Sequence, residues 1–237
     1  MAGGYGVLDS IADVFVPVHR DGHKFISIGL ALTVLFFIIA PPLGWICLIL
    51  TAWVAYFFRD PDRITPLREG LVIAPADGRV ASIEKVMPPP ELGMLGDERI
   101  RISIFLSLFD MHINRAPIAG RIKRSVYVPG SFLRASDNKS SDDNERRAMI
   151  IETPTGTEIA VLQIAGMITR RIVTFAGDGD TVGVGQRFGL IRFGSRVDIY
   201  LPEGHAAHVS VGQRMVAGET VIADLKSDEA EREARRS

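Results

Sequence analysis

The chain has 237 residues, a formal net charge of −1 and a single cysteine, Cys47. Because the charge is close to zero, we expect no nucleic-acid partner. One cysteine excludes an internal disulfide and a zinc site built on cysteines, and we expect no metal cofactor. The length fits one catalytic-sized domain with an accessory segment.

The first predicted elements are N-terminal helices. In residues 6–18 the apolar side chains follow one helical face, which fits either a helix in a membrane interface or a helix docked on the protein. Residues 26–58 contain no charged side chain, and so long an apolar run must meet lipid or a large buried interior. A Pro-Pro pair at 41–42 interrupts the run, so we expect two helices over about 26–40 and 43–58.

The apolar hairpin is predicted to associate with a membrane. Each arm of roughly 15 residues would be about 22 Å long, whereas the hydrocarbon core is about 30 Å thick, so the hairpin either crosses the bilayer or dips into it from one face. Basic residues flank it at 19–24 and 59–63, which indicates that both ends lie on the cytoplasmic side. We expect a location at the cytoplasmic face of the cell (inner) membrane; the alternative is a hairpin buried in a soluble protein.

From about residue 65 the sequence becomes a series of short β-type runs separated by Gly, Pro and Asp. No helical period persists through it, so we predict a mainly β domain, a sandwich or barrel. The motif V-x-V-G-Q-R occurs twice, in residues 181–193 and 208–222, and predicts two similar β-corners of the kind found in barrel-sandwich domains. The predicted runs are 71–86, 99–108, 120–130, 148–166, 187–202 and 213–225.

These patterns divide the chain into three predicted parts. Residues 1–64 hold the interfacial helix and the membrane hairpin, and residues 65–225 form the β domain. Residues 226–237 are a charged tail to which we assign no function. The predicted fold class is therefore mainly β, a sandwich- or barrel-like domain with barrel-sandwich corners, preceded by a helical membrane hairpin.

Three residues suited to catalysis occur in the β domain. Asp77 stands in the turn-like sequence APADGRV, where an aspartate either bonds its own backbone or orients a histidine. His112 follows the predicted run 99–108 and is either a solvated loop histidine or a site residue. Ser195 follows Gly194 at the start of a strand-like run.

The Gly194–Ser195 pair allows two reactions. Ser195 could attack an external acyl group as in serine hydrolases, although the G-x-S-x-G elbow of many such enzymes is absent. It could instead attack the carbonyl of Gly194, which glycine leaves unshielded. The residues alone leave both reactions open, and a non-catalytic, membrane-anchored barrel-sandwich adaptor would also explain the hairpin and the repeated motif.

Six motifs, taken together and in order, resemble phosphatidylserine decarboxylase, in its short prokaryotic branch of archaeal and alphaproteobacterial type. The resemblance extends over residues 57–202. The motifs are FFRDPDR, APADGRV, SLFDMHINRAPIAG, YVPGSF, NERR and FGSRVDIYLP.

The resemblance implies a proenzyme that cuts itself between Gly194 and Ser195. The Ser195 oxygen attacks the carbonyl of Gly194 to give an ester, elimination leaves dehydroalanine, and hydrolysis releases ammonia and leaves a pyruvoyl group. The products are a β chain, 1–194, and an α chain, 195–237, that begins with the pyruvoyl group. This group takes the place of pyridoxal phosphate: it forms a Schiff base with phosphatidylserine, carbon dioxide leaves, and phosphatidylethanolamine is released for phospholipid biosynthesis.

The resemblance also assigns the remaining site residues. Asp77 matches the aspartate of the family's PADG motif, and His112 matches the first histidine of its central motif. Longer members have a second histidine where this chain has Arg115, and a threonine where it has Arg196. Because that second histidine serves self-cleavage in longer members, either His112 takes both roles here or Asp77 acts directly on Ser195. The implied partners are phosphatidylserine and membrane lipid, and a homo-oligomer is compatible with the sequence.

Overall fold

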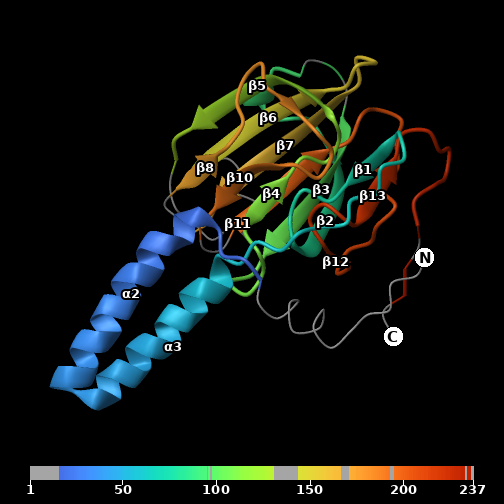
Figure 1. The fold of residues 1–237 in the computed structure, drawn as a ribbon. Coiled ribbons are helices and arrows are strands. Elements are labelled where there is room, and N and C mark those ends of the chain that lie inside the picture. The colour runs from blue at the N-terminus through green and yellow to red at the C-terminus, as the bar shows by residue number, and fades with distance from the viewer. Residues whose placement is uncertain are drawn as a thin grey trace, which may run out of the picture. The chain divides into compact units, whose positions relative to one another are not determined.

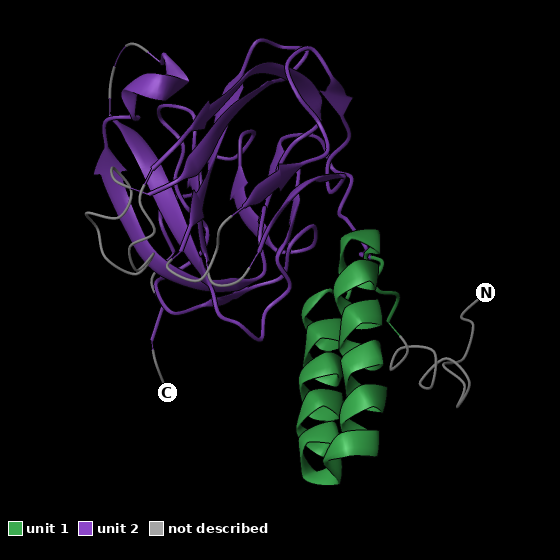
Figure 2. Ribbon diagram, turned by 90° about the vertical axis from the view of Figure 1, so that its left-hand side faces the viewer, with its two compact units in different colours: residues 1–62 green, residues 63–237 purple. Residues whose placement is uncertain are grey.

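The computed structural model describes residues 16–94, 96, 98–130, 144–166, 171–192, 195–232 and 234–235 of the chain (Figure 1). The chain forms two compact units, residues 1–62 and 63–237 (Figure 2). Most of the helix expected at residues 6–18 lies outside the described residues.

The N-terminal unit contains a hairpin of two helices, α2 (Arg20–Ile39) and α3 (Pro41–Phe57) (Figure 1). The two predicted helices are confirmed, but the break between them lies at Ala40 rather than at the two prolines. Pro41 and Pro42 occupy the first turn of α3. The N–H groups of a first turn have no partner inside the helix, and the fixed φ of proline suits the helical backbone there. The prolines therefore begin a helix.

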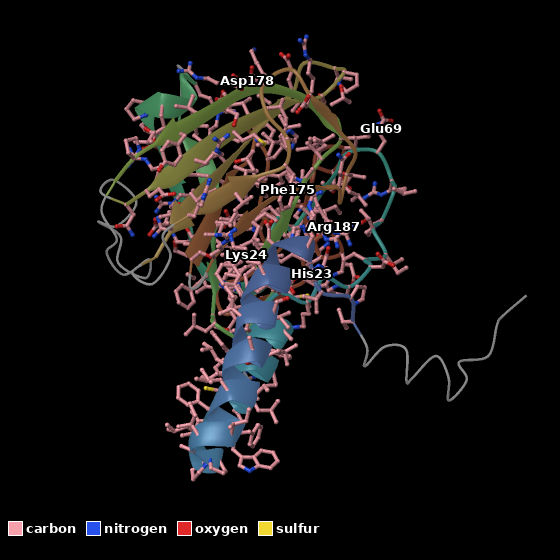
Figure 3. All side chains as sticks on the ribbon, turned by 60° about the vertical axis from the view of Figure 1, so that its left-hand side comes forward. His23, Lys24, Glu69, Phe175, Asp178 and Arg187 are labelled. Atoms are coloured by element: carbon pink, nitrogen blue, oxygen red, sulfur yellow. The ribbon has the colours of Figure 1, made fainter. Side chains whose placement is uncertain are left out.

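The hairpin has small and polar side chains inside and large apolar ones outside. Thr33 and Thr51 are only 5% and 6% exposed, and each hydroxyl donates to a backbone carbonyl of its own helix. A Cβ added at Gly29 would lie 2.4 Å from Thr51 Oγ1, so the helices approach closely at this point. Apolar side chains project outward along the hairpin (Figure 3), and their exposure reaches 78% at Ile38.

This arrangement is typical of helices that pack within lipid. A soluble hairpin buries its large apolar side chains, whereas membrane helices associate through small residues. Among the described helices, α2 is long and apolar enough to cross a membrane, and only 11% of its apolar window is buried. With 17 residues, α3 is shorter. The distribution of side chains thus favours a lipid environment over a soluble interior.

Gly29→Leu is expected to destabilise the hairpin. Even a Cβ at this position would collide with Thr51, so the larger side chain must push the helices apart, at a cost of about 1–3 kcal/mol. The midpoint of thermal unfolding in detergent, followed by helical circular dichroism, measures the effect. Val34→Leu is the matched control, because Val34 is 61% exposed. Equal midpoints for the two variants would contradict the close helix contact.

In the second unit, the regular elements of the described residues are β-strands and one short 3-10 helix, η1 (Pro90–Leu92). The strands are β1 (Leu71–Ile73), β2 (Gly78–Val86), β3 (Arg99–Leu106), β4 (Ile113–Arg115), β5 (Gly120–Val128), β6 (Arg146–Glu152), β7 (Glu158–Ala165), β8 (Ile172–Thr174), β9 (Thr181–Val182), β10 (Arg187–Ile191), β11 (Ser195–Tyr200), β12 (Arg214–Met215) and β13 (Val221–Asp224).

The strands of the second unit form three sheets, with a main apolar core and a second, smaller cluster of buried apolar side chains. The largest has the order β12-β2-β3-β11-β7-β6-β5-β9 and curls around the core (Figures 1 and 2). A three-stranded sheet, β4-β10-β8, and the pair β1-β13 complete the unit. Buried side chains such as Ile104, Val161 and Val197 fill the interior. The predicted mainly β fold with an N-terminal helical hairpin is confirmed.

Some predicted runs are divided, and some short strands are additional. The run 71–86 breaks into β1 and β2 at residues 74–77, and the run 187–202 breaks into β10 and β11. Strands β4, β8 and β9 have two or three residues each. Such segments are too short for the alternation of apolar and polar side chains to reveal them in the sequence.

The repeated V-x-V-G-Q-R motif forms two equivalent turns. In the first, the Gly183 N–H donates to Gln186 Oε1 at 2.8 Å. In the second, the Ser210 N–H donates to Gln213 Oε1 at 3.1 Å. In each turn the glutamine N–H also donates back to the carbonyl of the same partner residue. The glutamine side chain therefore closes both corners in the same way, as the sequence repeat predicts.

Candidate active site

Ser195 lies at the start of a central strand of the largest sheet. It is the first residue of β11, and its Cα partners are Leu106 on β3 and Ala165 on β7. The side chain is fully buried, and Oγ has no hydrogen-bond partner among the described residues. Gly194, the predicted partner in the bond to be cut, lies outside the described residues.

The sheet register places Asp77 near the same end of the sheet as Ser195. Arg79 pairs with Phe105, which sets Gly78 opposite Leu106, the Cα partner of Ser195. Neighbouring strands lie about 4.8 Å apart, so Gly78 and Ser195 are separated by two strand spacings, about 10 Å. Gly78 has a φ of +147°, and a Cβ there would lie 2.1 Å from the Phe105 carbonyl oxygen. The glycine that follows Asp77 is therefore required for β2 to approach β3.

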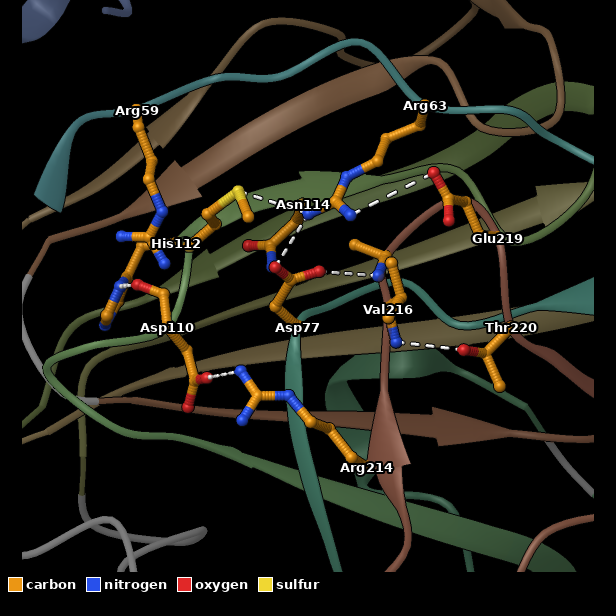
Figure 4. Close-up of polar contacts among 12 residues, drawn as sticks. Arg59, Arg63, Asp77, Asp110, His112, Asn114, Arg214, Val216, Glu219 and Thr220 are labelled. Carbon is orange, nitrogen blue, oxygen red and sulfur yellow. Dashed lines mark hydrogen bonds and ion pairs between the residues drawn. The ribbon is translucent and has the colours of Figure 1, made fainter. Parts of the chain in front are cut away.

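Asp77 is buried and both of its carboxylate oxygens are engaged (Figure 4). Oδ2 accepts from Arg63 Nη2 at 2.8 Å, and Oδ1 accepts from the Ala217 N–H at 2.6 Å. Arg63 also donates to Met111 Sδ at 3.1 Å. The Asp77 carboxylate thus connects two segments that are far apart in the sequence, one at Arg63 and one at Ala217. Arg63 is the last residue of the FFRDPDR motif, but its role as the partner of Asp77 was not predicted from the sequence.

His112 is buried, with 1% of its surface exposed, and lies directly before β4. Its Nδ1 is 2.9 Å from the Asp110 carbonyl oxygen (Figure 4), so Nδ1 donates the hydrogen of this bond. The His112 carbonyl accepts from the Ile191 N–H at 3.1 Å. Because Ile191 leads into Ser195 in the chain, this bond ties His112 to the segment that enters the predicted cleavage point.

The loop that carries His112 is held in place by Asp110. The carboxylate of Asp110 accepts from the Ser107 N–H at 2.9 Å and from Ser107 Oγ at 2.7 Å. Its other oxygen accepts from Arg214 Nη2 at 3.1 Å. These bonds fix the backbone carbonyl that orients the imidazole, so His112 has a defined tautomer and position.

The residues that replace the longer members' second histidine and threonine have structural contacts. Arg115 is buried and donates from Nη1 to the Gly185 carbonyl at 3.1 Å. Arg196 forms an ion pair with Asp198, in which Nη2 donates to Oδ2 at 3.0 Å and Nε lies 2.9 Å from Oδ1, and both side chains are buried. Burial, and then the neighbouring carboxylate of Asp198, raises the pKa of Tyr200 above its ordinary value, so this phenol stays neutral.

Two further buried polar residues of the second unit, Asn114 and Gln163, were not predicted from the sequence. Asn114 and Gln163 are 0% and 1% exposed and bond each other at 2.7 Å. Asn114 lies within the central motif SLFDMHINRAPIAG, which was the one available signal for it. Nothing in the sequence singled out Gln163. Among the described residues, no group of three His, Cys, Asp or Glu side chains is placed to hold a metal ion.

Comparison with known proteins identifies the family. A family model described as phosphatidylserine decarboxylase matches residues 50–223. Three relatives are named phosphatidylserine decarboxylase proenzyme. That of Ruegeria pomeroyi is 57% identical over 215 residues, which cover 90% of this chain and 98% of the relative. That of Cereibacter sphaeroides is 53% identical over 225 residues, 95% of this chain and 97% of the relative.

The third relative, from Nitrobacter winogradskyi, is 56% identical over 211 residues, which cover 89% of this chain and 85% of the relative. The family model spans the described strands from β1 to within β13, including Ser195, Asp77 and His112. The matches thus extend over the N-terminal hairpin as well as the β domain. On this evidence the chain belongs to the phosphatidylserine decarboxylase family.

Proposed function

We propose that the chain cuts itself between Gly194 and Ser195 and then converts phosphatidylserine into phosphatidylethanolamine. The decarboxylase activity follows from membership of the family. The observation that carries self-cleavage is the buried Ser195 hydroxyl, which has no hydrogen-bond partner among the described residues. A buried polar atom without a partner costs free energy, and such atoms are retained where a function needs them.

The position of Ser195 favours attack on the chain's own backbone. The side chain is 0% exposed in the uncut chain, so an external acyl group has no path to Oγ without a rearrangement of the sheet. The carbonyl of the preceding residue is always adjacent to it. This favours self-cleavage over the serine-hydrolase alternative, and family membership argues against a non-catalytic adaptor.

His112 is the base that the geometry supports. Its backbone carbonyl holds Ile191, in the segment that leads into Ser195, and an imidazole is a group able to take a proton from a serine hydroxyl. Asp77 accepts hydrogen bonds from Arg63 and from the Ala217 N–H, so a cation balances its charge. We infer that His112 supplies the base and that Asp77 with Arg63 fixes the adjoining turn.

The residues at the cut fit a pyruvoyl group formed from Ser195. When present, this group supplies an electron sink for the loss of carbon dioxide from the bound amine. The α chain would remain in place after cleavage, because β11 is paired along its length with both β3 and β7. The new chain end is therefore held at the centre of the sheet by the backbone ladder.

The apolar hairpin would hold the enzyme at its substrate. Each buried methylene of a lipid chain is worth about 0.8 kcal/mol, so drawing phosphatidylserine into water is prohibitive for a soluble enzyme. Basic residues at both ends of the hairpin, such as Arg20, Lys24 and Arg59, support a position at the cytoplasmic face of the membrane.

Turnover on vesicles tests the function. Purified full-length protein is mixed with vesicles of phosphatidylserine and phosphatidylcholine, and the lipids are analysed by mass spectrometry. We expect phosphatidylethanolamine and carbon dioxide to appear in equal amounts, with phosphatidylcholine unchanged. Release of fatty acid without phosphatidylethanolamine would instead support the hydrolase alternative.

His112→Gln is expected to slow self-cleavage by about a hundredfold or more, because general-base catalysis typically contributes at least this factor. The fraction of cut chain is followed on denaturing gels after synthesis. His205→Gln is the control, since His205 lies in the turn after β11, away from these contacts. Cutting of His112→Gln at the wild-type rate would leave Asp77 as the candidate base.

A further inference from the structure

A buried amide pair, Asn114 and Gln163, lies beside the predicted nucleophile. Gln163 Nε2 donates to Asn114 Oδ1 at 2.7 Å. Asn114 Nδ2 in turn points to the Pro75 carbonyl oxygen at 3.5 Å. The pair connects β7, β4 and the turn that contains Asp77.

The sheet register places Gln163 on the same face of the sheet as Ser195. In the β7–β11 pairing Ser195 is opposite Ala165, and Val197 is opposite Gln163. Side chains alternate along a strand and opposite residues share a face, so these four side chains point the same way. Gln163 is therefore the diagonal neighbour of Ser195. Such neighbours lie about 7–8 Å apart, within reach of a long side chain.

Two complementary buried atoms remain without partners on this face. Ser195 Oγ carries a hydrogen to donate, and Gln163 Oε1 is an acceptor; neither has a hydrogen-bond partner among the described residues. The Gln163 amide nitrogen donates to Asn114. This contact fixes the orientation of the amide, so the atom left without a partner is its oxygen, Oε1.

The far side of the Gln163 amide is closed by β10. A Cβ added at Gly189 would lie 2.9 Å from Gln163 Nε2, so the strand backbone packs directly against the amide. Gly189 is also the Cα partner of Asn114 in the β4–β10 pairing. The amide thus lies between Asn114 and the backbone at Gly189.

We propose that Gln163 Oε1 accepts the hydrogen of the Ser195 hydroxyl in the uncut chain and so fixes the rotamer of the nucleophile, with Asn114 holding the amide. The contact would form by rotation of the Ser195 side chain toward the amide that Asn114 holds. An amide oxygen is not a base, so Gln163 and Asn114 are positioning residues. The assignment rests on the proposed self-cleavage. It predicts that the contact is lost once Ser195 no longer carries a hydroxyl.

The test compares self-cleavage with turnover in full-length variants. Gln163→Leu is expected to cut about tenfold more slowly, the factor that one neutral hydrogen bond supplies, while turnover per cut chain is unchanged. Gln163→Glu keeps an acceptor at this position and should cut faster than Gln163→Leu. Asn114→Ala removes the partner that holds the Gln163 amide. It should also slow self-cleavage without changing turnover per cut chain. Cut fractions come from intact mass, and thermal midpoints report folding.

Ser103→Ala is the matched control. Ser103 Oγ is also buried without a partner, but Ser103 is the Cα partner of Asp198 and lies on the opposite face of the same sheet. It should cut at the wild-type rate. If folded Gln163→Leu and folded Asn114→Ala both cut at the wild-type rate, the assignment is wrong. It is also wrong if cutting and turnover per cut chain fall equally, because an equal fall indicates a structural role. A wild-type chain that never cuts would overturn self-cleavage itself, and this assignment with it.

Discussion

Ser195→Ala is expected to give a folded, uncut and inactive chain. The substitution removes the only atom of residue 195 that can attack the preceding carbonyl, so neither the break nor the group formed from it can arise. Stability should be nearly unchanged, because the lost hydroxyl has no hydrogen-bond partner among the described residues. Denaturing gels, intact mass and vesicle turnover measure the three properties on one preparation.

Two variants make the Ser195 result specific. Ser103→Ala removes another buried hydroxyl from the neighbouring strand β3 and should cut and turn over normally. Ser195→Cys keeps a nucleophile of similar size and should retain some cutting. Two fragments from Ser195→Ala, divided at the same bond, would show that another residue or a contaminating protease breaks the chain.

Asp198→Ala is expected to cause the largest loss of stability among single changes in the β domain. Asp198 is fully buried and holds the guanidinium of Arg196 through two contacts, at 2.9 and 3.0 Å. Removal of one partner of a buried ion pair leaves an uncompensated charge and costs about 3–5 kcal/mol. Because domains are stable by only about 5–15 kcal/mol, unfolding in urea should occur at a much lower concentration.

The Asp198 prediction has a matched pair of controls. The double variant Arg196→Met with Asp198→Leu removes both charges and should recover most of the stability, since buried pairs can be replaced by apolar side chains. Lys123→Ala breaks a half-exposed ion pair with Glu152 and Glu158 and should cost about 0–1 kcal/mol. A loss at Asp198 no larger than that at Lys123 would contradict the account of the pair.

The ion pair also explains one departure from the longer family members. Arg196 follows Ser195 and becomes the second residue of the α chain if the chain is cut there. Its bond to Asp198 lies on the same face of β11, two residues along the strand. The arginine therefore has a structural role in fixing the strand that begins at Ser195, independent of the cleavage chemistry.

Local patterns in the sequence were sufficient to predict the main elements. The charge-free run predicted the hairpin, and the β-type runs between Gly, Pro and Asp predicted the long strands β2, β3, β5 and β7. The repeated glutamine turns were predictable because each is closed by contacts within a few residues. The start of α3 was misplaced because proline ends helices in general but is well tolerated at the first position of one.

The candidate site was predictable only in part, because its contacts join distant segments. The pairing that sets Asp77 near Ser195 depends on the register of β2, β3 and β11, which no short motif encodes. The Arg63 partner of Asp77 and the Gln163 partner of Asn114 are likewise contacts between separate elements. Amide side chains carry no charge pattern, so Gln163 gives no signal in a single sequence.

The central claim is most directly tested by the mass of freshly purified, active protein under denaturing conditions. The account predicts two chains, residues 1–194 and 195–237, the smaller one blocked at its N-terminus and modified by a carbonyl reagent such as phenylhydrazine. A single chain of 237 residues with an intact Ser195 hydroxyl, in a sample that decarboxylates phosphatidylserine, would contradict it.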